Sequence, residues 1–242
     1  MCVDIWMQNV VDKKMLELPT VKDLCDTSQF RIIPSTYPPI NFFESLVEPA
    51  EMEALWEIES LTNDRLRQEA GDIFLVSREN RISGPGSSVV MAAFTHLSKP
   101  TRFSDGTYGV YYAGLSQETA IRETIYHREN FLRATAETSC DLTMRLYEGK
   151  IVKPFHDIRE KQFLVFHDPN SYVKSQVFGK KLRDMQSSGL IYNSVRHSGG
   201  SCIAAFKPLA VSIPHTILHL KYIWNGERIT DVLKIEKLLE LS

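Results

Sequence analysis

The sequence predicts an α+β fold, a mixed α/β domain in which helices flank a strongly bent mixed sheet. Segments with the two-residue alternation of strands and segments with helical spacing interleave along the chain, without the regular strand–helix–strand repeat of a parallel α/β domain. The composition is that of a globular protein, with 242 residues of which 43% are hydrophobic and 24% charged. A chain of this length can bury one large core.

The first third of the chain predicts a strand followed by an irregular region. Residues 1–28 are expected to form an N-terminal extension, to which we assign no chemistry. The run 30–33 (FRII) then reads as a strand that ends at Pro34, because proline has no N–H for a sheet ladder. Arg31 is the first cation on a predicted strand.

The elements expected between residues 48 and 95 are less regular. Apolar spacing predicts one or two helices over 48–70, and 72–77 (DIFLVS) reads as a strand. The segment 84–88 is a loop rich in Gly, Pro and Ser, and it lacks the pattern of a phosphate-binding P-loop. The apolar segment 89–95 fits a helix and a strand equally.

The stretch 99–127 combines a turn, an aromatic strand and a helix that carries a carboxylate. The turn at 104–106 (SDG) precedes a predicted strand at 108–113. Ser116 is suited to be the N-cap of the next helix. On that helix one face is expected to carry Ala120, Glu123, Thr124 and His127, whereas another carries Ile121, Ile125 and Leu132. Glu123 is therefore not required in the apolar core.

The rest of the chain supplies further strands and helices with recognisable periodicity. Residues 195–200 (VRHSGG) form a turn that follows a strand ending in the hydroxyl of Ser194. The other predicted elements are strands at 141–147, 189–194, 202–206 and 215–222 and helices at 171–186 and 231–241.

Charge and cysteine usage narrow the class of protein. The net charge of −2 gives no basic excess for a nucleic-acid partner. The cysteines, Cys2, Cys25, Cys140 and Cys202, are dispersed without metal-ligand spacing, so we expect reduced thiols and a cytoplasmic location. No apolar run approaches the roughly 18 residues that a membrane span needs, and the first residues lack a signal-peptide pattern.

Three polar residues in a fixed order carry a family resemblance. Arg102 in TRFSDGTYGVYYA, Glu123 in ETAIRETIYH and Ser194 in GLIYNSVRHSGG resemble the Arg, Glu and Ser after which the RES domain is named. By this resemblance these three are the catalytic residues. Arg31 and Tyr112 then match the family's opening-strand arginine and strand aromatic as substrate-binding residues, with Arg81 as a rival for the place of Arg31.

The resemblance implies a fold and an activity. RES domains are similar in fold to ADP-ribosyltransferases, and they are toxins of toxin–antitoxin modules that deplete NAD. On this basis residues 29–242 are the catalytic domain with an insertion at about 41–98, and the partners are NAD and a cognate Xre-type antitoxin. Whether two copies form a homodimer is left open. The chain departs from the family where Phe103-Ser104 replaces its usual Trp-Asn.

The chemistry of NAD agrees with these residue types. Nicotinamide leaves as a neutral molecule, and the ribose passes through an oxocarbenium-like state that the Glu123 carboxylate can stabilise. The guanidinium groups of Arg102 and Arg31 suit the pyrophosphate. Tyr111 and Tyr112 alternate faces on their strand, so one packs in the core and the other can contact substrate. We expect no metal or cofactor, and we prefer phosphorolysis, with inorganic phosphate as co-substrate, over hydrolysis.

Four other interpretations are considered for the polar residues of the chain. ADP-ribosyl transfer to a protein keeps the site and changes the acceptor. A non-enzymatic binding module would use the polar residues only to complete a buried network. A serine hydrolase would pair Ser194 with His197, although the G-x-S-x-G elbow is missing. A metal site at His215 and His219 lacks a third ligand nearby in sequence.

Overall fold

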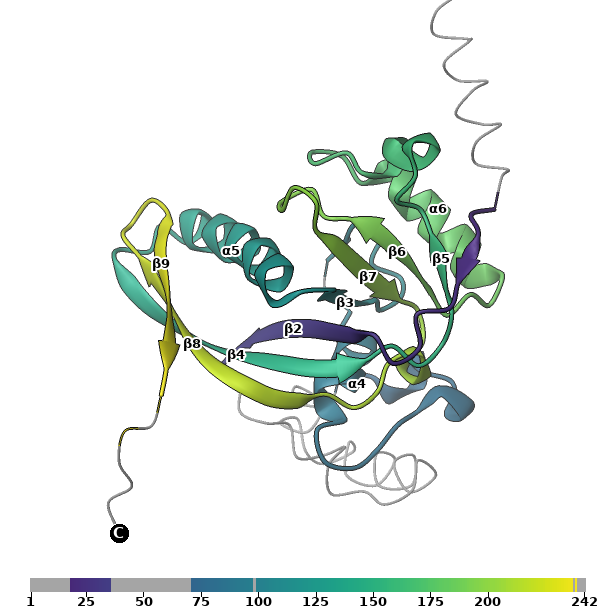
Figure 1. The fold of residues 1–242 in the computed structure, drawn as a ribbon, viewed down its shortest axis with the longest axis horizontal. Helices are drawn as coiled ribbons and strands as arrows, with labels where there is room; N and C mark the ends of the chain where they lie inside the picture. Colours follow the sequence, from purple (N-terminus) through teal and green to yellow (C-terminus); the bar gives the residue numbers. More distant parts are fainter. Residues whose placement is uncertain (1–17, 36–70, 98, 237, 239–242) are drawn as a thin grey trace, which may run out of the picture.

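A single mixed sheet organises the molecule (Figure 1). The computed structural model describes residues 18–35, 71–97, 99–236 and 238. Within them the sheet has the strand order β1-β5-β6-β7-β3-β2-β4-β8-β9, in which β5 and β6 are parallel and the other neighbours are antiparallel. The predicted α+β fold with helices flanking a mixed sheet is confirmed.

The bounds of the elements follow the chain. The strands are β1 Val21–Lys22, β2 Ser28–Pro34, β3 Tyr111–Gly114, β4 Cys140–Lys150, β5 Phe155–Asp157, β6 Gly189–Asn193, β7 Ser201–Ala205, β8 His215–Trp224 and β9 Ile229–Ile235. The helices are α4 Ser88–Thr95, α5 Gln117–Ala134 and α6 Val173–Asp184, with short 3-10 turns at Ile73–Leu75, Arg78–Asn80, Lys161–Phe166 and Pro208–Ala210. β1 lies in the predicted N-terminal extension and pairs with β5.

The helices flank the sheet (Figure 1). Three apolar clusters pack them against it. The alternating residues of β3, β6 and β7 divide between two of them, because successive strand side chains point to opposite faces. One face packs against α4 and the other against α6. The third cluster joins Ile121 and Ile125 of α5 to β2, β4 and β8. The predicted apolar face of α5 is confirmed.

The sheet is nearly split between β2 and β3. β2 pairs with β4 at seven positions from Ser28 to Pro34, but it pairs with β3 only where Phe30 faces Gly114. At Gly114 the chain passes so close to α5 that an added Cβ would lie 2.7 Å from the backbone nitrogen of Ala120. The two strands do not pair beyond this point, and residues of both line the same pocket.

The strand predicted at 72–77 is wrong. These residues form a 3-10 turn at Ile73–Leu75, because the Asp72 carboxylate accepts a hydrogen bond from the N–H of Phe74 and starts the turn. Ile73 and Val76 are buried, whereas Phe74 is exposed. A local side-chain bond decided the conformation of an apolar run.

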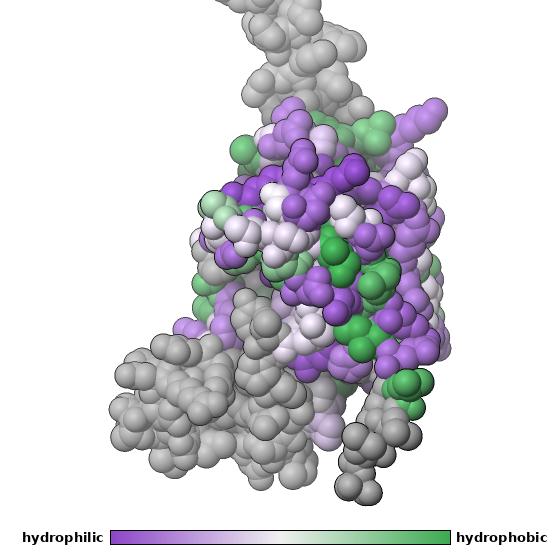
Figure 2. All heavy atoms as spheres, turned by 90° about the vertical axis from the view of Figure 1, so that its left-hand side faces the viewer, coloured by the Kyte–Doolittle hydropathy of each residue, from purple (hydrophilic) through white to green (hydrophobic). Residues whose placement is uncertain are grey.

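The helix predicted at 231–241 is also wrong. Its first residues belong to β9, which pairs antiparallel with β8 as the edge strand of the sheet. Asn225 accepts hydrogen bonds from the N–H groups of Glu227 and Arg228, and Gly226 has a φ of +95°, so the turn folds the chain back at once. Figure 2 shows the face at this edge, where apolar side chains stand among polar ones; Leu233 and Ile235 are exposed there.

The remaining predicted helices and strands can be compared with the structure where it describes them. Segment 89–95 is helical in α4, and the strands and helices predicted between 108 and 222 are present with shifted ends. The helices predicted over 48–70 lie outside the described residues. In the part of the chain that the structure describes, no helix combines the length and apolar character needed to cross a membrane.

Candidate active site

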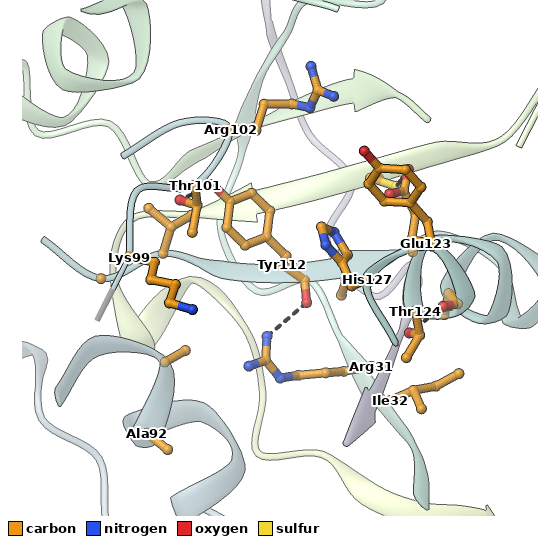
Figure 3. Close-up of a pocket in the computed structure, with 18 of the residues that line it drawn as sticks. Arg31, Ile32, Ala92, Lys99, Thr101, Arg102, Tyr112, Glu123, Thr124 and His127 are labelled. Atoms are coloured by element: carbon orange, nitrogen blue, oxygen red, sulfur yellow. Dashed lines mark hydrogen bonds between the residues drawn. The ribbon is translucent and has the colours of Figure 1, made fainter. Parts of the chain in front are cut away.

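A pocket of about 750 Å³ opens beside β3 at the split in the sheet (Figure 3). β2, β3, α4 and α5 contribute to its wall. The predicted polar face of α5 lines it, since Ala120, Glu123, Thr124 and His127 all belong to the wall. Glu123 is the only acidic side chain among the described residues that line the pocket.

Helix α5 places Glu123 in the pocket. The Ser116 hydroxyl caps the helix by accepting the N–H of Thr119 at 3.1 Å, which confirms the predicted N-cap. Glu123 follows two turns later and is partly buried. The Ser194 hydroxyl donates a hydrogen bond to Glu123 Oε1 at 2.6 Å. Two of the three predicted catalytic residues are therefore in direct contact.

Ser194 contacts Glu123 without lining the pocket itself. It lies directly after β6 and is not one of the residues of the pocket wall. Its oxygen accepts the backbone N–H groups of Arg196 and His197 at 3.1 and 2.9 Å. With both acceptor positions used, the hydroxyl proton is directed to Glu123. This geometry orients the carboxylate.

Arg102 also lines the pocket. Its Nη1 donates to the carbonyl of Asp168 at 2.8 Å, and its guanidinium lies over the ring of Tyr172 at 4.5 Å. These contacts fix the side chain, which is 7% exposed. A guanidinium has five N–H donors, so a fixed Arg102 retains donors for an anion.

Arg31 occupies the split between β2 and β3. Its Nη1 donates to the carbonyl of Tyr112 at 2.9 Å, drawn as a dashed line in Figure 3. Arg31 so binds a backbone acceptor that β2 does not pair. The guanidinium lies over the Tyr111 ring at 4.5 Å, and burial lowers its pKa. Its Nε is buried without a hydrogen-bond partner among the described residues. Arg31 thus braces the pocket wall and keeps unused donor capacity.

The two tyrosines of β3 point to opposite faces of the sheet, as expected. Tyr111 is fully buried and donates to Gln29 Oε1 at 3.1 Å. Tyr112 lines the pocket, and its hydroxyl accepts the N–H of Phe103 at 3.0 Å. Burial raises the pKa of Tyr112 to about 12, so the phenol stays neutral at physiological pH. In Figure 3 its ring lies between Arg102 and Arg31.

Arg81, the rival of Arg31, is placed elsewhere. It is 5% exposed, its Nε donates to the carbonyl of Val76 at 2.9 Å, and it is not part of the pocket wall. Arg31, by contrast, belongs to that wall.

Sequence reasoning missed several residues of the pocket. Arg128 and Lys99 add two cations to its wall, and Tyr172 and Cys202 also line it. Arg128 adjoins His127 on α5, so its position on the helix could have drawn attention to it. No sequence signal indicated that Tyr172 stacks on Arg102.

The positions of the described residues do not support a serine hydrolase site or a metal site. The His197 ring hydrogen-bonds the Thr119 hydroxyl through Nδ1 at 2.9 Å, while the Ser194 hydroxyl donates to Glu123, so these two side chains do not form a nucleophile and base pair. Among the described residues, no group of three or more His, Cys, Asp or Glu side chains is placed to hold a metal ion.

Comparison with known proteins gives the family. The model described as RES domain matches residues 78–225. The chain belongs to the RES domain family. The RES match contains Arg102, Glu123 and Ser194, whereas Arg31 on β2 precedes it and β9 follows it.

The chain is also similar to two individual proteins. The chain is 29% identical over 203 residues to the uncharacterized protein y4oC of Sinorhizobium fredii (strain NBRC 101917 / NGR234), covering 83% of this chain and 84% of that protein. A solved structure, the MbcT–MbcA toxin–antitoxin complex of M. tuberculosis, aligns with a TM-score of 0.41 and 7% identity over 94% of this chain and 90% of the matched chain.

Proposed function

We propose that this RES domain protein cleaves the bond between nicotinamide and ribose in NAD. One observation carries the proposal: a single carboxylate, Glu123, faces a pocket whose described wall otherwise carries Arg31, Lys99, Arg102 and Arg128. NAD needs a negative group near its reacting ribose and positive groups near its two phosphates. Family membership supports the same substrate.

The cations are suited to the pyrophosphate. Arg102 and Arg31 are held by backbone carbonyls and aromatic rings, so binding a phosphate costs them little side-chain entropy. Planar guanidinium groups offer two parallel N–H donors to phosphate oxygens. The ring of Tyr112 provides a flat surface for the nicotinamide or the ribose.

Glu123 would stabilise the positive charge that develops on the ribose. As the glycosidic C–N bond breaks, its electron pair moves to the pyridinium nitrogen and nicotinamide leaves uncharged. The ribose then carries oxocarbenium character, and a fixed carboxylate lowers the energy of that state. No general acid is needed for the leaving group, which fits the absence of a second carboxylate from the described pocket wall.

Inorganic phosphate is our preferred acceptor. A phosphate oxygen would form the new bond to the ribose carbon, giving ADP-ribose 1″-phosphate. The pocket wall holds more cations than one pyrophosphate requires, and guanidinium donors can orient a second anion.

The test is to incubate purified protein with NAD, with and without phosphate, and to identify the products by mass. Phosphorolysis predicts faster NAD loss with added phosphate and a phosphorylated ADP-ribose. Arg102→Lys should weaken the phosphate dependence, because an ammonium lacks the planar pair of donors. Plain ADP-ribose at a rate independent of phosphate would mean hydrolysis, and label on added protein would mean ADP-ribosyl transfer. Intact NAD under all conditions would favour a binding module.

We also propose that the protein is a toxin held in check by a cognate antitoxin of the Xre type. This partner follows from the RES family, whose members deplete cellular NAD. Expression of the chain should arrest growth and lower NAD, and a Glu123→Gln variant expressed to the same level should do neither. Growth and NAD that stay normal with active protein would contradict the toxin role.

A further inference from the structure

The two oxygens of the Glu123 carboxylate have different surroundings. Oε1 accepts the Ser194 hydroxyl at 2.6 Å and the Cys202 thiol at 3.8 Å. The described residues donate no such bond to Oε2. Both donors thus converge on one oxygen of a side chain that lines the pocket.

The donors come from different elements. Glu123 lies on α5, Ser194 follows β6, and Cys202 is on β7. Cys202 is 2% exposed and belongs to the pocket wall, and it is paired with Gly114 of β3. Because Gly114 carries no side chain, the thiol has room beside the strand that forms the pocket.

The thiol is well suited to remain a donor. Burial raises the pKa of Cys202, and the charge of Glu123 raises it further, so the sulfur keeps its proton. A thiolate would repel the carboxylate. A neutral S–H group supplies a weak hydrogen bond and no competing charge.

We propose that Cys202 is a positioning residue, which together with Ser194 holds Oε1 of Glu123 so that Oε2 faces the substrate. This inference rests on the proposed NAD cleavage for its kinetic consequence. A carboxylate fixed before the reaction stabilises developing charge without reorganising during it. Two donors from separate segments of the chain restrict rotation of the carboxylate more than the Ser194 bond does by itself.

The kinetic test compares Cys202→Ala with Cys202→Ser. Loss of the donor should lower kcat about 5- to 10-fold, the rate equivalent of one modest hydrogen bond. KM for NAD should stay near its wild-type value, because Cys202 holds the carboxylate and not the substrate. Cys202→Ser keeps an O–H donor and should recover most of the rate. Cys140→Ala, which removes a thiol from β4 outside the pocket wall, is the matched control.

An infrared measurement tests the contact without any activity. The S–H stretching band of Cys202, assigned by its loss in Cys202→Ala, should lie at lower frequency than a thiol without an anionic acceptor. Glu123→Ala should move it to higher frequency.

The outcomes separate the two proposals. A band that does not respond to Glu123→Ala, or an active Cys202→Ala variant with wild-type kcat, overturns the positioning role. A band that shifts in a protein that cleaves no NAD supports the contact and overturns the proposed function instead.

Discussion

Glu123 lies on α5, but its carboxylate is oriented by residues from a later part of the chain. Ser194 donates to it, and the apolar clusters are built from other residues, such as Ile121 and Ile125 on a different face of the helix. Its charge is therefore available for catalysis and is not needed for packing. This separation makes the residue a clean target for substitution.

Glu123→Gln should lower NAD turnover by about 10² to 10³, the usual effect of removing an electrostatic stabiliser. The melting temperature should remain close to that of the wild type, because the amide keeps the shape of the side chain and can still accept from Ser194. Turnover is measured as NAD loss, and stability by thermal unfolding.

Glu118→Gln is the control for this prediction. Glu118 lies on the same helix with its side chain 59% exposed, paired with Arg122 and absent from the pocket wall. Its substitution should leave turnover near the wild-type value. Equal rates for the two variants would remove Glu123 from the mechanism.

At the scale of elements, the start of α5 links the helix to the pocket. Ser116→Ala removes the N-cap bond to Thr119 and should lower the free energy of unfolding by about 1 kcal/mol, within a range of roughly 0.5 to 2. Because Glu123 lies two turns further on, kcat should change little. Denaturant unfolding and NAD turnover are the measurements.

Ser116→Asn provides the comparison, since asparagine is an equally good N-cap. It should recover most of the stability. If Ser116→Asn were as unstable as Ser116→Ala, the cap bond would not explain the loss.

Elements with strong local signals could be predicted from the sequence. The cap at Ser116 and the helical face of Glu123 and His127 needed only spacing and hydrogen-bonding capacity. The helix predicted at 231–241 is wrong because its apolar spacing also suits a strand. The Asn225-Gly226 pair before it is typical of a β-hairpin and is the signal that would have indicated the return along β8. The strand predicted at 72–77 is wrong because one hydrogen bond to Asp72 outweighed the preference of an apolar run for a strand.

The site was predictable only in part, for a related reason. Motif order indicated Arg102, Glu123 and Ser194. Strand alternation predicted that only one of Tyr111 and Tyr112 can contact substrate, and the family resemblance selected Tyr112. Contacts between distant segments leave no local pattern, so the stacking of Arg102 on Tyr172 required the folded chain.

At the scale of the whole molecule, the buried carboxylate of Asp157 links the edge strand β1 to its neighbour β5. Asp157 on β5 is 2% exposed and pairs with Lys22 of β1 and with Arg159, each at 2.8 Å. Burial by itself would raise the pKa of Asp157, but the hydrogen bonds from Arg159 and Lys22 outweigh it and hold the pKa below its usual value.

The ion pairs of Asp157 predict how the stability of the protein depends on pH. Because the pKa of Asp157 is lower in the folded state, the unfolded state binds more protons as the solution is acidified. The contribution is complete above the unfolded pKa of about 3.9 and is lost as pH falls toward the folded value. Asp157→Asn should lower the free energy of unfolding at neutral pH by about 1.5 to 3 kcal/mol. That difference should shrink in acid, as measured by unfolding at several pH values.

Asp141→Asn is the matched control. Asp141 pairs with Lys221 at 3.0 Å, but both side chains are well exposed. Exposed pairs contribute about 0 to 1 kcal/mol, so this variant should remain near the wild type at every pH. A difference for Asp157→Asn that stayed constant down to strongly acid pH would argue against its ionised pair.

The long contacts of Glu123 also set when the site is completed during synthesis. Ser194 lies 71 residues after Glu123, and Cys202 lies 79 residues after it. Chains leave the ribosome from the N-terminus, so α5 emerges well before the segments that orient its carboxylate. A translation product that ends between residues 123 and 194 contains Glu123 but neither Ser194 nor Cys202. The oriented carboxylate therefore first exists when most of the protein has been made, and shorter fragments do not contain it.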